Sequence, residues 1–269
     1  MTTATEIWAY RNLIYNLAQR ELRSRYKKSI GGWAWSLINP ASTLLIYTMV
    51  FGVFLGGQAP LMGNGRNSVF ALYLFSGLVA WNCFSGVVNG SILALQNAGS
   101  LLNKVYFPPS IPAIANLFTV LLQTLIEGAI LVVIMLAMGN VSFTLVLFPL
   151  MLVFLSCFAL GVGLIVSVYN VYLRDVGYIT SIGMNLLFYS TPIVYTLSKV
   201  PESKFGIPLH AIISANPVTR FVEWSRDAFY LLQWPSLSSW ITIVGWAVVG
   251  LVGGFVVFQR KARNVTEEL

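Results

Sequence analysis

Side chains that could carry catalytic chemistry are few in this sequence and lie far apart. The 269 residues include nine acidic residues and one histidine, His210. No H-E-x-x-H sequence occurs, no acidic pair lies on a loop, and no set of Ser, His and Asp favours nucleophilic catalysis. A histidine-based metal site or proton relay is therefore disfavoured, and the chain is not predicted to be an enzyme.

Short motifs and single residues also indicate whether the chain could bind a nucleotide or couple transport to an ion. No segment matches G-x-x-x-x-G-K-[ST], and no Gly-Lys pair occurs, so the chain is not predicted to bind a nucleotide in a P-loop. Only Glu127 lies well inside an apolar run, where ion-coupled transporters place carboxylates. Glu127 can equally be structural, held by polar neighbours such as Gln123 and Thr124. A single carboxylate gives only weak support for proton-coupled transport.

The composition of the chain indicates whether it lies in water or in a membrane. The chain is 57% hydrophobic and 9% charged, whereas soluble domains average about 25% charged residues. It is therefore predicted to be an all-α integral membrane protein. Its 16 basic residues gather at the ends of apolar runs, which favours contact with the cytoplasmic leaflet and not with nucleic acid.

Six apolar runs are long enough to cross a bilayer, because about 20 apolar residues suffice. Basic residues concentrate near the two ends of the chain and in the even-numbered loops. This pattern predicts a single transmembrane domain, residues 1–269, in an inner or plasma membrane with both termini cytoplasmic. The predicted spans are 34–56, 69–94, 112–137, 145–169, 177–198 and 237–258.

Residues 5–28 form a basic segment ahead of the first span. Six of the 16 basic residues lie between Met1 and Lys28. Apolar residues recur on one face of the expected helix, which is typical of a helix lying in the membrane interface. The paired glycines Gly31-Gly32 then predict a sharp bend. The apolar face comprises Ile7, Tyr10, Leu13, Ile14, Leu17, Ala18 and Leu22.

Residues 199–232, between the last two predicted spans, contain a helix start at Asn216-Pro217. Asn is a favoured N-cap, and Pro is favoured at the first helical position. Two short apolar segments meet there, which indicates a re-entrant hairpin or two interfacial helices at the mouth of a pore. The candidate gate residues are Asn216, Pro217, Phe221, Trp224 and Arg226.

Aromatic residues make up 14% of the chain and cluster in the first and fifth predicted spans. Trp and Tyr near span ends are usually interface anchors. Tyr inside a span is less expected against lipid, because its hydroxyl needs a partner. Rings that stack on sugar faces would suit a path for a glycan. The candidate path residues are Trp33, Trp35, Tyr47, Phe51, Phe188, Tyr189 and Tyr195.

Five segments together resemble the permease subunit of ABC-2-type polysaccharide exporters, which move O-antigen, teichoic acid and related lipid-linked glycans. They are spread over the whole chain in the family's order. One departure is Gly31, where the family more often has an apolar residue. The segments are R-E-L-R-S-R-Y-K-K-S-I-G-G-W-A-W-S-L-I-N-P (20–40), L-L-N-K-V-Y-F-P-P (101–109), N-V-Y-L-R-D-V (170–176), S-T-P-I-V-Y (190–195) and N-P-V-T-R-F-V-E-W-S-R (216–226).

The resemblance implies a homodimer paired with two copies of a separate ATPase, which would bind the ATP and magnesium; no cofactor is expected on this chain. Residues 97–109 would be a cytoplasmic coupling helix docked on the ATPase, with the N-terminal helix at the same interface. Residues 199–232 would be extracytoplasmic gate helices. The candidate coupling residues are Arg20, Arg23, Arg25, Leu101, Lys104, Tyr106, Phe107, Arg174 and Asp175.

Export of a lipid-linked polysaccharide, such as O-antigen, teichoic acid or a cell-wall galactan, is therefore the expected function. An ABC-2 exporter of a drug or small lipid shares the six-span plan and remains an alternative. An ATP-independent channel or flippase is a second alternative, and a membrane glycosyltransferase is a third, although the chain lacks the acidic pair that such an enzyme needs.

Overall fold

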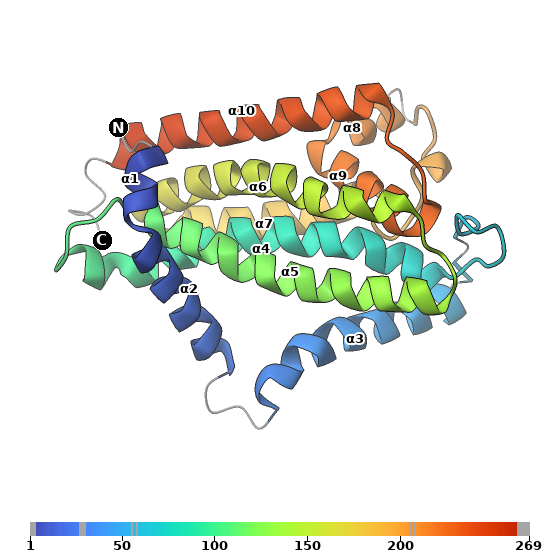
Figure 1. Cartoon of the computed structure of the whole chain (residues 1–269). Coiled ribbons are helices and arrows are strands. Elements are labelled where there is room, and N and C mark those ends of the chain that lie inside the picture. Colours follow the sequence, from blue (N-terminus) through green and yellow to red (C-terminus); the bar gives the residue numbers. More distant parts are fainter. Residues whose placement is uncertain are drawn as a thin grey trace.

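The computed structural model describes residues 4–26, 31–54, 56–57, 59–204, 206 and 208–262, and these residues form helices joined by turns and loops, with no β-strand among them (Figure 1). The side chains of Arg25 and Trp33 lie outside the described part. The helices are α1 (Ala4–Ala9), α2 (Arg11–Tyr26), α3 (Trp35–Tyr47), α4 (Phe70–Leu102), α5 (Ile111–Ala137), α6 (Leu147–Tyr172), α7 (Asp175–Ser190), α8 (Leu209–Ala215), α9 (Pro217–Arg226) and α10 (Leu237–Lys261).

Short irregular turns extend three of these helices. α3 continues into a π-helical segment, Thr48–Phe54, and α9 continues into another, Asp227–Leu231. A 3₁₀ turn, Phe143–Val146, precedes α6. The first two positions matter because π-helical backbone leaves carbonyl groups that need other partners, and such segments are frequent at functional sites.

Five helical stretches of the described chain are long and apolar enough to cross a membrane: Trp35–Phe54, Phe70–Leu102, Ile111–Ala137, Phe143–Tyr172 and Leu237–Lys261. The all-α membrane fold is therefore confirmed. The fifth predicted span, 177–198, instead gives the 16-residue α7, which ends at Ser190. Thr191 precedes Pro192 and is extended, since proline disfavours helical backbone in the residue before it.

Helices α4, α5, α6 and α10 run side by side and form the body of the bundle (Figure 1). α4 lies in its centre, with buried residues along its whole length. Its 33 residues extend for about 50 Å, longer than the roughly 30 Å hydrocarbon core, so one end must project from the membrane. α1 and the end of α10 lie at one end of the bundle, and α8 and α9 lie at the other.

The closest helix contact joins α6 and α10 through glycines. A Cβ atom on Gly161 of α6 would lie 1.9 Å from the Gly250 carbonyl oxygen of α10, and one on Gly254 would lie 2.4 Å from Gly161 Cα. Gly250 and Gly254 are four residues apart and therefore share one helix face. Small residues at this spacing let two membrane helices pack backbone to backbone.

Replacing Gly161 by Ala should therefore force α6 away from α10. We expect the variant to lower the free energy of unfolding by about 1–3 kcal/mol, the usual cost of overpacking. Thermal unfolding in detergent measures this loss. Gly253→Ala is the matched control, because no atom lies within 4 Å of its added Cβ. Equal unfolding temperatures for the two variants would contradict the glycine contact.

The N-terminal amphipathic segment forms α1 and α2, which break at Tyr10. Its predicted apolar face is confirmed, since Ile14 and Ala18 are in the protein core and Leu13 and Leu17 pack against it. α2 packs on α5, and the location of this helix in the membrane interface stays a prediction. Exposed Trp8 and Tyr15 lie outside this packed face.

Residues 97–109 do not form a separate helix. α4 continues to Leu102, and turns and loop backbone lead from there to α5. The predicted span ended at residue 94, whereas α4 stays helical for about two more turns. A role in docking stays a prediction, now for the end of α4 and the loop after it.

Candidate transport path and gate

The predicted helix start at Asn216-Pro217 is confirmed at α9. The Asn216 side chain accepts a hydrogen bond from the Val218 amide at 3.0 Å, and Pro217 occupies the first helical turn. Asn216 also donates to the Thr191 hydroxyl at 3.2 Å, which ties α9 to the end of α7. α9 is therefore fixed at its first residue to the loop that follows α7.

The predicted gate aromatics are buried in the bundle. Phe221 is fully buried and stacks on Phe158 of α6 at 5.9 Å between ring centroids. Trp224 is 1% exposed and meets Trp240 of α10 edge-on at 4.6 Å. α9 thus packs its aromatic face against three long helices, α4, α6 and α10.

Arg226 lies at the centre of this end of the bundle and is 2% exposed. Its guanidinium donates to the carbonyl oxygens of Pro192 at 2.6 Å and Ile193 at 2.5 Å. It also lies over the Tyr73 ring, 3.9 Å from the centroid. These contacts join the α7–α8 loop, α9 and α4, so Arg226 positions the gate segment and does not line an open passage.

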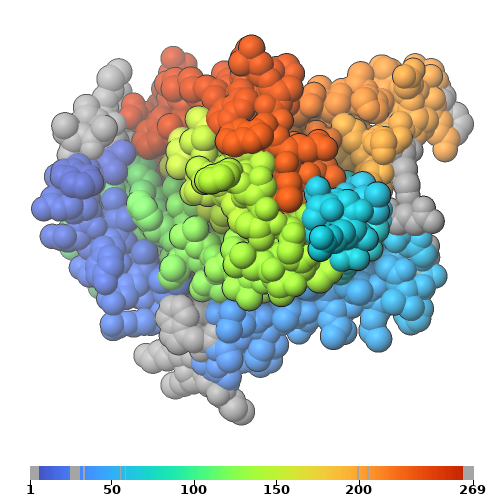
Figure 2. All heavy atoms as spheres, turned by 45° about the vertical axis from the view of Figure 1, so that its right-hand side comes forward, coloured from blue at the N-terminus to red at the C-terminus, as the bar shows by residue number. Residues whose placement is uncertain are grey.

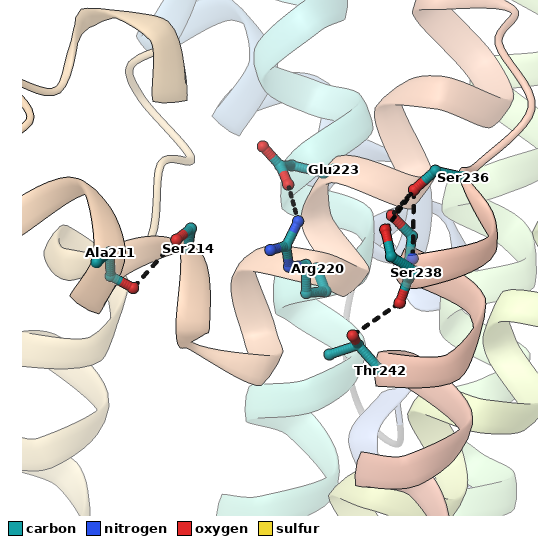
Figure 3. Close-up of polar contacts among 8 residues, drawn as sticks. Ala211, Ser214, Arg220, Glu223, Ser236, Ser238 and Thr242 are labelled. Carbon is teal, nitrogen blue, oxygen red and sulfur yellow. Dashed lines mark hydrogen bonds and ion pairs between the residues drawn. The ribbon is translucent and has the colours of Figure 1, made fainter.

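A polar cavity of about 230 Å³ lies beside α9 and the start of α10. Arg220 and Glu223 form an ion pair of 3.7 Å there, and Ser236 caps α10 nearby (Figure 3). Burial is the main cause that raises the pKa of Glu223, and Arg220 opposes it. Burial, with Glu223 adding to it, also raises the pKa of the Asp227 carboxyl to about 7.

The raised pKa of Asp227 predicts pH-dependent stability. The folded chain binds a proton at Asp227 between about pH 4 and pH 7, and the unfolded chain does not. The free energy of unfolding should therefore fall as the pH rises through this window. We expect Asp227→Asn to flatten the fall, as measured by unfolding temperature in detergent from pH 5 to pH 8. An unchanged pH slope would contradict this prediction.

The π-helical segment after α9 takes its hydrogen bonds from distant side chains. Asn140, fully buried, donates to the carbonyls of Phe229 and Tyr230, both at 3.0 Å. Thr144 donates to the Ala228 carbonyl at 3.0 Å. The loop that precedes α4 lies against the same segment, where the Gly63 amide donates to the Tyr230 carbonyl at 2.9 Å (Figure 2). Side-chain donors thus replace backbone hydrogen bonds that the π-helical segment lacks.

The predicted path aromatics come from α3 and α7, and the structure brings part of the set together. Tyr47 stacks on Phe51 at 5.6 Å, and the Tyr47 and Tyr189 side chains lie close enough to interact electrostatically. Phe188 packs edge-on against Tyr189 at 5.2 Å.

The other path candidates lie outside this group. Tyr195 folds back and donates to the carbonyls of Tyr189 and Ser190. Trp35, 43% exposed, lies at the other end of α3. The Trp33 side chain is outside the described part of the chain.

α3 lies at the edge of the bundle and contains a proline in its interior (Figure 1). Pro40 has no amide hydrogen to donate to the Ser36 carbonyl, four residues earlier. Gln123 of α5 supplies that bond, with its Nε2 donating to the Ser36 oxygen at 3.1 Å. A neighbouring helix thus satisfies the carbonyl that proline frees, as membrane helices require.

This arrangement predicts that Pro40 and Gln123 are energetically coupled. Gln123→Leu should lower the free energy of unfolding by about 1–3 kcal/mol, because the buried Ser36 carbonyl loses its donor. In a Pro40→Ala background residue 40 regains an amide that can bond the same carbonyl, so the loss should shrink. A double-mutant cycle on unfolding in detergent measures the difference. Equal losses in both backgrounds would show that Gln123 acts elsewhere.

Comparison with known proteins places this architecture in a family. The model of the family described as "ABC-2 type transporter" matches residues 12–230, from α2 through the π-helical segment after α9. The chain belongs to the ABC-2 type transporter family. It is thus a transporter permease, and its several apolar helices make it a multi-pass membrane protein.

The relatives found by sequence comparison match most of the chain. The "O-antigen export system permease protein RfbA" of Myxococcus xanthus is 27% identical over 98% of both chains. A protein of the same name from Klebsiella pneumoniae is 29% identical over 81% of this chain and 80% of its own. The "Polysialic acid transport protein KpsM" of Escherichia coli is 28% identical over 78% of each.

The candidate coupling residues of this ABC-2 permease lie on α2, at the end of α4 with the loop after it, and at the start of α7. Tyr106 is 92% exposed, whereas the adjacent Phe107 is 3% exposed and anchors the α4–α5 loop in the core. Leu101 is partly buried against the core. Five more of the predicted residues are exposed there, namely Arg20, Arg23, Lys104, Arg174 and Asp175. The side chain of Arg25 is outside the described part.

Three positioning residues were not found from the sequence, namely Asn140, Thr144 and Gln123 in its contact with Ser36. Asn140 and Thr144 lie at the two ends of a short loop without charge. Their polar side chains are the only signal in the sequence that could have indicated this role. Within the described residues, no group of three or more His, Cys, Asp or Glu side chains could hold a metal ion.

Proposed function

We propose that this chain is the transmembrane subunit of an ATP-driven exporter that moves a lipid-linked polysaccharide from the cytoplasm to the outer face of the membrane. The observation that carries the proposal is the match over 98% of both chains to a relative named as an O-antigen export permease. The polysialic acid relative extends the same substrate class to a second polymer.

The arrangement of aromatic residues supports a glycan path along α3 and α7. Tyr47 of α3 interacts electrostatically with Tyr189 of α7, Phe51 stacks on Tyr47, and Phe188 packs edge-on against Tyr189. Ring faces can stack on the apolar face of a pyranose while the tyrosine hydroxyls keep polar partners. A passage with this lining would let successive sugars slide without a fixed binding geometry.

The poor coverage of α3 and α7 supports assembly of two copies. In α3 only Ser36 and Pro40 are buried, and in α7 only Met184 is buried. Both helices therefore present apolar surface to a second chain or to lipid. In the proposed dimer, α3 and α7 of the two copies enclose the passage between them.

Energy would enter at the bundle end that carries α1, from two copies of a separate ATPase that binds ATP and magnesium. Exposed Tyr106, held in place by buried Phe107, is suited to docking there. The orientation that follows places both termini in the cytoplasm and α8 and α9 at the outer face. The basic residues on the α1 side agree with a cytoplasmic location.

Tyr47→Ala and Phe51→Ala test the proposal. Each should lower glycan export by about threefold to tenfold, since a lost ring stack is worth about 0.5–1.5 kcal/mol. Export is measured as surface glycan against glycan retained inside, and co-purification of the ATPase checks assembly. Leu45→Ala is the control, because Leu45 is 60% exposed on the other side of α3. Normal export in both variants would count against the aromatic path, and failure to recover any ATPase would favour an ATP-independent channel.

A further inference from the structure

A second polar cavity lies between α3 and the body of the bundle, away from the gate. Its volume is about 440 Å³, and α3, α4 and α5 all contribute to its wall. Polar side chains dominate the lining, although all three helices are apolar enough to span a membrane. The lining residues are Trp35, Ser36, Asn39, Pro40, Thr43, Asn82, Gln123 and Glu127.

With the helix ends on the α9 side at the membrane surface, this cavity lies near mid-depth of the membrane. Asn82 is 12 residues from the start of α4, and Glu127 is ten residues from the end of α5, distances of about 18 Å and 15 Å along the helices. Both helix ends are at the α9 side of the bundle. Half of the hydrocarbon core is about 15 Å thick, so the cavity opens where polar side chains are most costly.

The lining combines hydrogen-bond donors and acceptors. Glu127 is 5% exposed, and its Oε2 accepts a bond from Asn82 Nδ2 at 3.1 Å. Gln123 donates from its Nε2 to the Ser36 carbonyl. None of the eight lining residues is basic. The cavity therefore offers phosphate no lysine or arginine to pair with, and its amide, hydroxyl and carboxyl groups fit a ligand that both donates and accepts hydrogen bonds, such as the hydroxyls of a sugar.

The cavity joins the aromatic path along one face of α3. At 100° per residue, Ser36, Pro40, Thr43 and Tyr47 fall within a narrow arc of the helix. Ile38 and Leu45 lie on the opposite side and are 42% and 60% exposed. A chain that leaves the cavity along this face would next meet the Tyr47 and Phe51 rings.

We propose that the cavity formed by Asn39, Thr43, Asn82 and Glu127 binds the sugar hydroxyls of the transported chain on its way to the aromatic path. The pyrophosphate or other anionic link to the lipid is excluded from this site. The proposal rests on the proposed function, because it assigns a subsite to the exported glycan.

Site-specific photo-crosslinking tests the cavity directly. A benzophenone amino acid is placed at position 39 or 43, facing the cavity, and at position 38 or 45, facing away, in cells that make the native glycan and the full transporter. Position 47 is the positive control for the path. We expect glycan-stained adducts of the permease at 39, 43 and 47, and none at 38 or 45.

The possible outcomes separate the two proposals. Adducts at 47 without adducts at 39 or 43 would overturn the cavity site and leave the glycan path standing. Adducts at 39 or 43 that contain only a second copy of the chain would also overturn it, since the dimer would then fill the cavity. No glycan adduct at any of the five positions would overturn both proposals.

A variant of the same shape tests the role of Glu127. Glu127→Gln replaces a carboxyl oxygen by an amide nitrogen that cannot accept a hydrogen bond, and we expect it to lower the glycan adduct at position 39 by about threefold to tenfold, the usual effect of losing one hydrogen bond. Thr124→Val is the matched control on α5, because Thr124 donates to the Val120 carbonyl of its own helix and does not line the cavity. If Glu127→Gln lowers the unfolding temperature but leaves the amount of glycan adduct unchanged, Glu127 stabilises the fold and does not bind the glycan.

Discussion

Backbone groups at membrane depth must find partners within the protein, and this constraint organises the structure. Regular helices meet it by themselves, but the chain departs from regular helix at Pro40 and at the π-turn after α9. In each place a side chain from another helix or loop supplies the missing bond: Gln123 at Ser36, and Asn140 at Phe229 and Tyr230. At these two places the irregular backbone is supported by a distant residue.

The same constraint divides the bundle into a tightly packed part and a loosely held part. α6 and α10 meet through glycine backbones, which leave no room for relative movement. α3 has two buried residues and receives a hydrogen bond from Gln123 of α5 at the Ser36 carbonyl. A hydrogen bond of this kind can be exchanged for one with water or a substrate at little cost, whereas a glycine seam cannot. We therefore expect α3 to move during transport against the frame that the rest of the bundle forms.

Local signals in the sequence predicted the local features. The Asn216-Pro217 helix start and the apolar face of α2 depend on neighbouring residues, and both were found in advance. The end of α7 was missed because hydropathy alone carried the fifth span past Pro192. The anchoring role of Arg226 depends on Pro192 and Ile193, more than 30 positions away, and that of Asn140 on residues about 90 positions away. Contacts of this range follow from the packed fold, and no spacing in the sequence encodes them.

The order of side chains along α3 carries a physical meaning for a passing polymer. Hydrogen-bonding groups come first, near mid-depth, and aromatic rings follow toward the α9 end. A site made of hydrogen bonds holds a sugar in one orientation, whereas stacked rings hold it loosely and tolerate sliding. Gly32 has a positive φ of 47° just before α3, and Pro40 interrupts the hydrogen bonding of α3 in the wall of the polar cavity. We therefore expect bending of α3 at Pro40 to change the position of the cavity side chains relative to the aromatic rings.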